Sequence, residues 1–143
     1  MKFEEFIQRP GVLNDEINQK EATLESMKAA SLYAVSDPSQ TPSGNPHYDS
    51  VIEKHIARIN ELEQLIPALK QERAIAAAEL SQLLSELKSP RQIKILTMRY
   101  LQRLEYSVII DRIGYSKQTV FRDHENGLAA AKKIYIEKYE KRE

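Results

Sequence analysis

The stretch from Ser89 to Val120, SPRQIKILTMRYLQRLEYSVIIDRIGYSKQTV, decides the fold of the C-terminal third of the chain. Its first four residues signal the start of a helix. Ser89 can act as the N-cap, Pro90 suits the first helical position, and Gln92 completes a capping box. Apolar residues then recur at helical spacing, so the pattern predicts a helix that runs to about Leu101.

The rest of this stretch predicts two further helices that are separated by a tight turn. After a short turn over residues 102–105, a second helix is expected over residues 106–113. Gly114 supplies the positive φ that a tight turn needs, and Ser116 caps a third helix from Lys117 to about residue 133 or beyond. A short helix, a three-residue turn with glycine and a second capped helix are typical of the helix-turn-helix.

The outer face of the third helix carries long polar side chains, as expected of a helix that enters the major groove of double-stranded DNA. Lysine and arginine can donate to guanine or phosphate, glutamine can pair with adenine, and an aromatic ring can contact a thymine methyl group. Two lysines near the helix end suit phosphate contacts. The candidate DNA-binding residues are Lys117, Gln118, Thr119, Phe121, Arg122, Lys132 and Lys133.

Residues 90–133 resemble region 4 of bacterial sigma factors and the related regulators. The matching strings are Pro90-Arg-Gln-Ile-Lys-Ile-Leu-Thr-Met-Arg-Tyr-Leu and Ile113-Gly-Tyr-Ser-Lys-Gln-Thr-Val. In that family the helix after the Gly-x-Ser turn reads the major groove, and the resemblance assigns this role to Lys117, Gln118, Phe121 and Arg122. Two positions depart from the family pattern: Glu105 stands where a Ser or Thr cap is usual, and Ile110 where a small residue is common.

The whole chain also resembles a family of small proteins from phages and mobile islands of Gram-positive bacteria, some of them relatives of phage late-gene transcription activators. The match includes Leu32-Tyr-Ala-Val-Ser-Asp-Pro-Ser, His47, Arg99-Tyr-Leu, Gly114-Tyr-Ser and Phe121-Arg-Asp-His. This resemblance implies a role in phage or island gene regulation, and it does not identify a promoter.

Two long helices are expected before residue 88. The first runs from about residue 3 to residue 35, with a break near Pro10-Gly11. Residues 36–47 contain three prolines, a glycine and small polar residues, and they predict a loop. The second helix covers about residues 48–87, and its heptad stripe is Tyr48, Ile52, His55, Ile59, Leu62, Ile66, Leu69, Arg73, Ala76, Leu80, Leu83 and Leu87.

A stripe of this length must be covered by a partner helix. The first helix can fold back on the second as an antiparallel hairpin, and Pro67 predicts a kink or break near residues 63–65. The first helix is too short to cover the whole stripe. The C-terminal end of the stripe, on the second helix, is therefore a candidate dimerisation surface. Alternatively, this end packs on the C-terminal module. The candidate dimerisation residues are Ala76, Leu80, Leu83 and Leu87.

Composition and charge narrow the function classes. The chain has no net charge, yet residues 1–88 hold 9 basic and 14 acidic residues, whereas residues 89–143 hold 12 and 7. A basic C-terminal part favours a polyanionic partner there. The absence of cysteine excludes disulfides and thiolate metal sites, and no catalytic motif, cofactor motif, metal-ligand spacing or membrane-length apolar run stands out. The expectation is a cytoplasmic protein without enzymatic activity or cofactor.

We therefore expect an all-α protein of two parts. Residues 1–88 form a helical hairpin or coiled coil for dimerisation, and residues 89–143 form a three-helix module with the helix-turn-helix. The expected function is transcriptional regulation through double-stranded DNA, by a homodimer that can also contact RNA polymerase. Two alternatives remain open: a small terminase subunit that recognises a packaging site, and an interaction protein that binds polymerase or another regulator instead of DNA.

Overall fold

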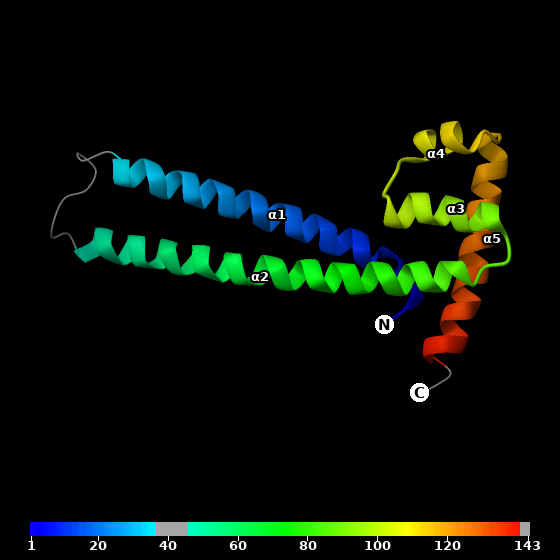
Figure 1. Cartoon of the computed structure of the whole chain (residues 1–143), viewed down its shortest axis with the longest axis horizontal. Helices are drawn as coiled ribbons and strands as arrows, with labels where there is room; N and C mark the ends of the chain where they lie inside the picture. Colours follow the sequence, from blue (N-terminus) through cyan, green and yellow to red (C-terminus); the bar gives the residue numbers. More distant parts are fainter. Residues whose placement is uncertain (37–45, 141–143) are drawn as a thin grey trace. The chain divides into compact units, whose positions relative to one another are not determined.

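The computed structural model describes the backbone of residues 1–36 and 46–140 and the side chains of residues 1–31 and 50–140. Within these ranges all regular structure is helical and no strand occurs, which confirms the all-α class (Figure 1). The predicted loop lies mostly outside the described residues. The elements are α1 (Phe3–Ser36), α2 (Pro46–Ser85), α3 (Pro90–Leu96), α4 (Tyr106–Ile113) and α5 (Lys117–Tyr135), with π-helical turns over Thr97–Leu101 and Ile136–Glu140.

The chain divides into two units, and each is described by itself. The first consists of residues 1–12 and 73–143 and is called the core unit, and the second consists of residues 13–72 and is called the helix-pair unit. Helices α1 and α2 contribute to both units. The sequence predicts a different boundary, at residue 88, between two parts that each fold independently. That boundary remains a prediction.

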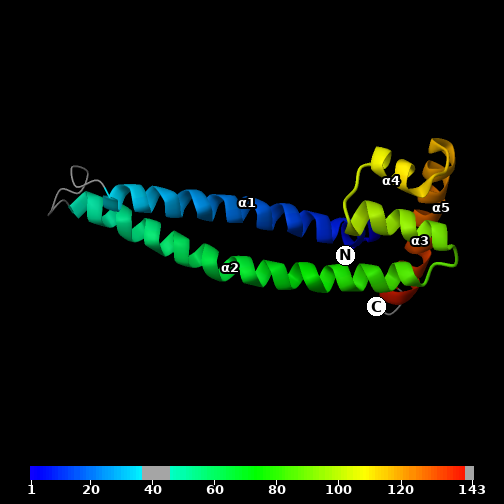
Figure 2. The ribbon, with the colours of Figure 1, turned by 45° about the horizontal axis from the view of Figure 1, so that its top comes forward.

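The helix-pair unit consists of two helical segments that run antiparallel, as Figure 2 shows for α1 and α2. Ile17 and Leu62 are fully buried between them. Two ion pairs connect the segments across the seam, Lys28–Glu63 at 2.8 Å and Lys70–Glu21 at 2.7 Å. The predicted stripe of the second helix lies inward in both units, because each member with a described side chain is buried or half-buried.

His55, a polar member of the stripe, contacts the backbone of α1. The Nε2 atom of His55 lies 2.8 Å from the backbone carbonyl oxygen of Met27. A carbonyl can only accept, so the imidazole N–H must be the donor. This bond between the two helical segments favours a role of His55 in fixing the register of the helix pair.

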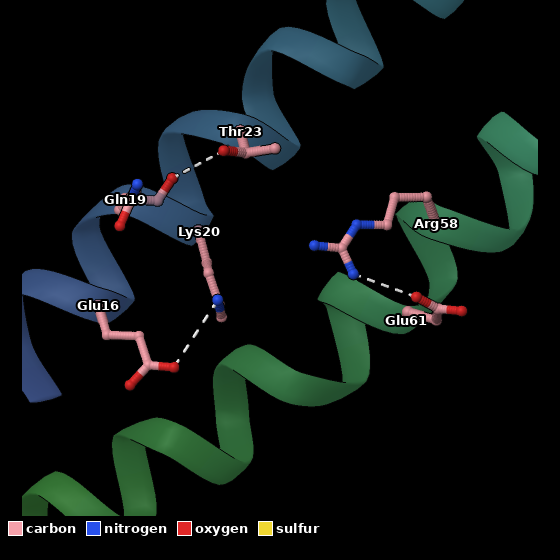
Figure 3. A network of polar contacts seen from close by, with 6 residues as sticks. All are labelled: Glu16, Gln19, Lys20, Thr23, Arg58 and Glu61. Atoms are coloured by element: carbon pink, nitrogen blue, oxygen red, sulfur yellow. Dashed lines mark hydrogen bonds and ion pairs between the residues drawn. The ribbon is translucent and has the colours of Figure 1, made fainter.

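Polar contacts on the surface of the helix-pair unit join neighbouring turns of one helix (Figure 3). Lys20 lies 3.7 Å from Glu16, four residues earlier, and Arg58 lies 3.1 Å from Glu61, three residues later. The Thr23 hydroxyl donates to the Gln19 carbonyl at 3.0 Å. Exposed pairs of this kind stabilise a helix by about 0.2–0.5 kcal/mol each, so the buried seam contributes more than these contacts.

The predicted break at Pro10-Gly11 is wrong, and of the kink or break expected near residues 63–65 the break does not occur. Helix α1 continues through Pro10 and Gly11, and α2 continues through Pro67. A proline removes one backbone hydrogen bond, whereas tertiary packing supplies most of the stability of a helix. Around the first site that packing is dense: Ile7, Pro10, Gly11 and Leu13 are all buried.

The core unit contains two clusters of buried side chains. The larger joins the start of α1, the end of α2, α3 and α5, and it consists of Phe3, Phe6, Ile7, Leu80, Leu83, Leu84, Leu87, Leu96, Ala131 and Tyr135. The smaller lies among α3, its π-helical turn, α4 and α5, and it consists of Ile95, Met98, Ile109 and Val120. Together they fix α5 against the rest of the unit along its buried side.

The candidate dimerisation residues are part of this interior. Leu80 and Leu83 are 0% and 1% exposed, and Ala76 and Leu87 are 6% exposed. In the structure this end of α2 packs with α3 and α5, which is the alternative noted from the sequence. Because the four side chains are covered within one chain, they do not form a surface that a second copy can reach.

Candidate nucleic-acid interface

Local capping sets the ends of the three C-terminal helices. The Ser89 hydroxyl accepts from the Gln92 N–H at 3.3 Å, and the Ser116 hydroxyl accepts from the Thr119 N–H at 3.2 Å. Gly114 has φ 79°, and its N–H donates to the Ile110 carbonyl at 3.1 Å. These caps match the predicted ones. They place α4, a three-residue turn and α5 in sequence (Figure 1).

The inner side of α5 packs closely on the core unit. Val120 and Ala131 are fully buried, and Gly127 faces α3. A Cβ atom added to Gly127 would lie 3.0 Å from Leu96 Cδ1 and 3.3 Å from Gln92 Cβ, so glycine allows the two helices to approach. The opposite side of α5 therefore has a fixed orientation toward solvent.

The first two turns of α5 present three long polar side chains. Lys117, Gln118 and Arg122 are all exposed. Thr119 is half-buried, and its hydroxyl lies 2.9 Å from that of Ser116. These side chains could donate to base edges or to phosphate oxygens in a groove.

Phe121 takes a more structural position than the sequence suggests. Its ring is half-buried, with its centroid 4.9 Å from that of Tyr106 at the start of α4. The Lys117 ammonium lies 5.9 Å from the Phe121 ring centroid. The ring thus supports the lysine and packs α5 on α4, with part of its surface left for a partner.

The two lysines near the end of α5 differ. Lys132 donates to the Glu4 carboxylate at 3.1 Å, and both side chains are about half or more exposed. A backbone hydrogen bond at Glu4, followed by the bond from Lys132, lowers the pKa of Glu4. Lys133 is exposed on the stripe that also carries Gln118 and Arg122. Lys133 is the more accessible of the two for a phosphate.

An ion pair connects α5 to the start of α3. Arg91 binds Asp123, which is 7% exposed, and the Arg91 guanidinium lies 4.5 Å over the ring of Tyr115 in the turn before α5. The bond to Asp123, and then that to Tyr115, raises the pKa of Arg91. One arginine thus contacts both the turn and the helix that it introduces, which favours a fixed α5 orientation.

His124 occupies the buried side of α5 and faces two tyrosines. Its Nε2 atom lies 3.0 Å from the Tyr100 hydroxyl and 3.3 Å from the Tyr106 hydroxyl. His124 is 5% exposed. This burial is the main cause that lowers the pKa of its imidazole. Burial likewise raises the pKa of Tyr100. This position makes His124 part of the packing between α5 and α4, and it does not reach a groove.

Two features of this surface were not anticipated from the sequence. Asn126 is exposed four residues after Arg122, so it extends the outward stripe by one turn. Helical periodicity alone could have found it. Arg91 and Asp123 lie far apart in sequence, and no local signal pairs them.

No protein-family model, curated protein or solved structure matches the chain. Among the described residues, no helix has both the length and the apolar content needed to span a bilayer. The same part of the chain holds no group of three or more His, Cys, Asp or Glu side chains arranged to bind a metal ion.

Proposed function

We propose that the chain is a DNA-binding transcriptional regulator whose α4, turn and α5 form a helix-turn-helix. One observation carries the proposal: α5 buries one side and presents Gln118 and Arg122 on the other, with Lys117 exposed in its first turn. A recognition helix needs this division, because its inner side fixes the angle of approach and its outer side contacts base edges.

Each exposed side chain has a chemical counterpart on DNA. Arg122 and Lys117 can donate to guanine O6 and N7 or to phosphate, and Gln118 can bond adenine N6 and N7. Lys133 suits a backbone phosphate, and Lys132 can do the same by exchanging its exposed Glu4 partner. The resemblance to sigma region 4 agrees with this assignment, and the second resemblance suggests a regulator of phage or mobile-island genes.

Homodimerisation through a helical hairpin and contact with RNA polymerase remain parts of the proposal. A dimer would place two recognition helices on half-sites about one helical turn of DNA apart, or a multiple of it. Because the residues expected to pair two chains are buried in the core unit, such a dimer must use another surface.

The proposal is tested on a duplex site selected from a random library, with binding followed by fluorescence polarisation. Each of Lys117→Ala and Arg122→Ala should weaken binding to the selected site about ten-fold or more, since a good base contact is worth about 1–3 kcal/mol. The matched control is Arg58→Ala, which removes one exposed charge from α2 and should leave affinity unchanged. Circular dichroism must show full helicity in all three variants.

The outcomes separate the alternatives. Wild-type affinity in both α5 variants would disprove α5 as the recognition helix. Failure of the protein to bind any duplex at low salt would favour the interaction protein. A solution mass of eight or more chains would favour the terminase subunit over the regulator.

A further inference from the structure

Asn126 lies in the third turn of α5 with its side chain exposed. Asparagine and glycine are both weak helix formers, yet Asn126 and Gly127 follow each other in the middle of a 19-residue helix. The close approach of α3 explains Gly127. No hydrogen bond or ion pair joins the Asn126 side chain to another residue that the structure describes. A residue that weakens its own helix without a structural gain is expected at a functional position.

The side chain of Asn126 continues the outward stripe of α5. Residues four apart on a helix lie on the same side, so Gln118, Arg122 and Asn126 follow one another along it. The helix rises about 1.5 Å per residue, which separates Arg122 from Asn126 by about 6 Å. Base pairs of B-DNA are about 3.4 Å apart. A helix that lies along the groove therefore brings these two side chains to bases that are at most about two base pairs apart.

The amide of Asn126 limits the bases that it can recognise. Its oxygen accepts a hydrogen bond and its NH₂ group donates one. In the major groove adenine presents the N6 donor beside the N7 acceptor, so the amide forms two hydrogen bonds with it. Guanine presents two acceptors, cytosine one donor, and thymine one acceptor with a methyl group. Adenine is thus the base that pairs with both groups of the amide.

The neighbours of Asn126 are engaged on the packed side of α5. Asp123 is buried in its ion pair with α3, and His124 is buried against the two tyrosines. Glu125 is exposed, but its carboxylate lies 4.0 Å from the His124 Nδ1 atom and thus leans toward that side. Among Asp123, His124, Glu125 and Asn126, only Asn126 therefore offers both a donor and an acceptor on the outward side.

We propose that Asn126 is a further specificity-determining residue, which reads an adenine within two base pairs of the guanine that Arg122 contacts. This inference rests on the proposed function, because it requires α5 to lie in the major groove. It assigns a sequence class to the site, in which adenine and guanine stand close together. The competing role of the same amide is a phosphate contact, which carries no sequence information.

The test selects duplex sites from a random library with the wild-type chain and repeats the selection with Asn126→Ala. The wild type should prefer adenine at one position close to a guanine. In the variant this preference should disappear, and affinity for the wild-type site should fall about ten-fold, as expected for the loss of one bidentate base contact. Affinity for a scrambled duplex and the salt dependence of binding should stay unchanged, because an amide neutralises no phosphate charge.

A second variant, Asn126→Asp, changes the base preference without changing the shape of the side chain. The carboxylate keeps the acceptor and removes the donor. Aspartate accepts from cytosine N4, so the preference at the same position should change from adenine to cytosine. The added negative charge weakens binding to every duplex. The comparison is therefore made between the four bases at this position within the variant.

The alanine variant is not expected to unfold α5, because alanine is a better helix former than asparagine. Circular dichroism checks that its helicity equals that of the wild type. The matched control is Asn60→Ala, which removes an exposed asparagine from the middle of α2. This control should keep both the affinity and every base preference of the wild type.

The outcomes for this inference and for the proposed function differ. If Arg122→Ala loses the guanine preference while Asn126→Ala keeps every base preference, the assignment of Asn126 is wrong and the proposed function stands. An equal loss of affinity for the selected and the scrambled duplex in Asn126→Ala would show a phosphate contact, and it would also overturn the assignment. If the wild type selects no site, the proposed function fails and the inference fails with it.

Discussion

The two units of this chain bury their side chains in different ways. In the helix-pair unit two helical segments meet along one seam, and among its described side chains the large residues less than 2% exposed are Ile17 and Leu62. In the core unit four helices and the start of α1 enclose side chains from several directions, and seven large residues reach that level: Leu80, Leu83, Leu84, Ile95, Leu96, Ile109 and Val120. Two helices shield side chains from water only along their line of contact, so they bury less apolar surface than a core enclosed from several sides. We therefore expect the core unit to contribute most of the free energy of unfolding.

The largest expected effect comes from truncating one fully buried leucine in each unit. Leu96 and Leu62 are both 0% exposed, and Leu→Ala in a core costs about 2–5 kcal/mol. Leu96→Ala should fall near the upper end, because helices on several sides prevent collapse around the cavity. Leu62→Ala should fall near the lower end, because water can enter a single seam. Urea unfolding gives the totals.

Amide exchange locates these effects. Leu96→Ala should speed exchange in α3 and α5 and weaken DNA binding, whereas Leu62→Ala should speed it within residues 13–72 and leave DNA binding intact. Equal losses of stability, with exchange raised across the whole chain in both variants, would show that the two units unfold as one.

The contact between α5 and α3 at Gly127 offers a second comparison, because in the described part of the helix-pair unit no glycine brings the two segments together. Gly127→Ala gains about 1 kcal/mol of helix propensity, yet overpacking a core costs about 1–3 kcal/mol. The added Cβ would meet the fully buried Leu96, whose displacement is restricted. We expect a net loss of about 1 kcal/mol. Thermal unfolding measures it, and a higher midpoint would mean that α5 can move away from α3.

The same contrast explains what the sequence could predict. Gly114 predicts the C-terminal end of α4 and Ser116 predicts the start of α5, because a cap acts on residues only a few positions away. The break expected at Pro10 fails because packing of neighbouring turns outweighs one lost hydrogen bond. The left-handed φ of Arg103 has no signal in the sequence, because a residue with a Cβ atom gives no hint of it.

Parts of the candidate site could also be predicted from the sequence. The exposure of Gln118 and Arg122 follows from helical periodicity and the buried position of Val120. Lys117 lies three residues before Val120, so periodicity does not predict its exposure; it is exposed at the first position of the helix. The contact between Arg91 and Asp123 depends on how α3 meets α5, and a single sequence does not encode that in any local pattern. Side-chain placement on one helix is thus predictable, whereas contacts between helices are not.

His124 makes the stability of the core unit depend on pH. Burial lowers the pKa of the folded imidazole below its ordinary 6.5. Between the folded and unfolded pKa values the unfolded chain binds more protons, so stability rises with pH through this range. The contribution is therefore fully present above about pH 6.5 and is lost as the pH falls toward the folded pKa.

The measurement is the unfolding midpoint of wild type and His124→Gln between pH 5 and 8. The variant should lose part of the pH dependence, although carboxylates still contribute at the acid end. Amide exchange in α5 should show the effect, and exchange within residues 13–72 should not. Identical pH profiles for the two proteins would mean that the imidazole remains solvated in the folded state.

The smallest effect is expected from an ion pair of the helix-pair unit. Lys28 and Glu63 lie 2.8 Å apart across the seam, with side chains 52% and 45% exposed. Exposed ion pairs contribute about 0–1 kcal/mol and are screened by salt, so Lys28→Ala should change stability by less than Leu62→Ala. A double-mutant cycle with Glu63→Ala at low and high salt isolates the pair. A coupling well above this range that persists at high salt would show that the antiparallel register depends on charge, and that the single apolar seam does not suffice to fix it.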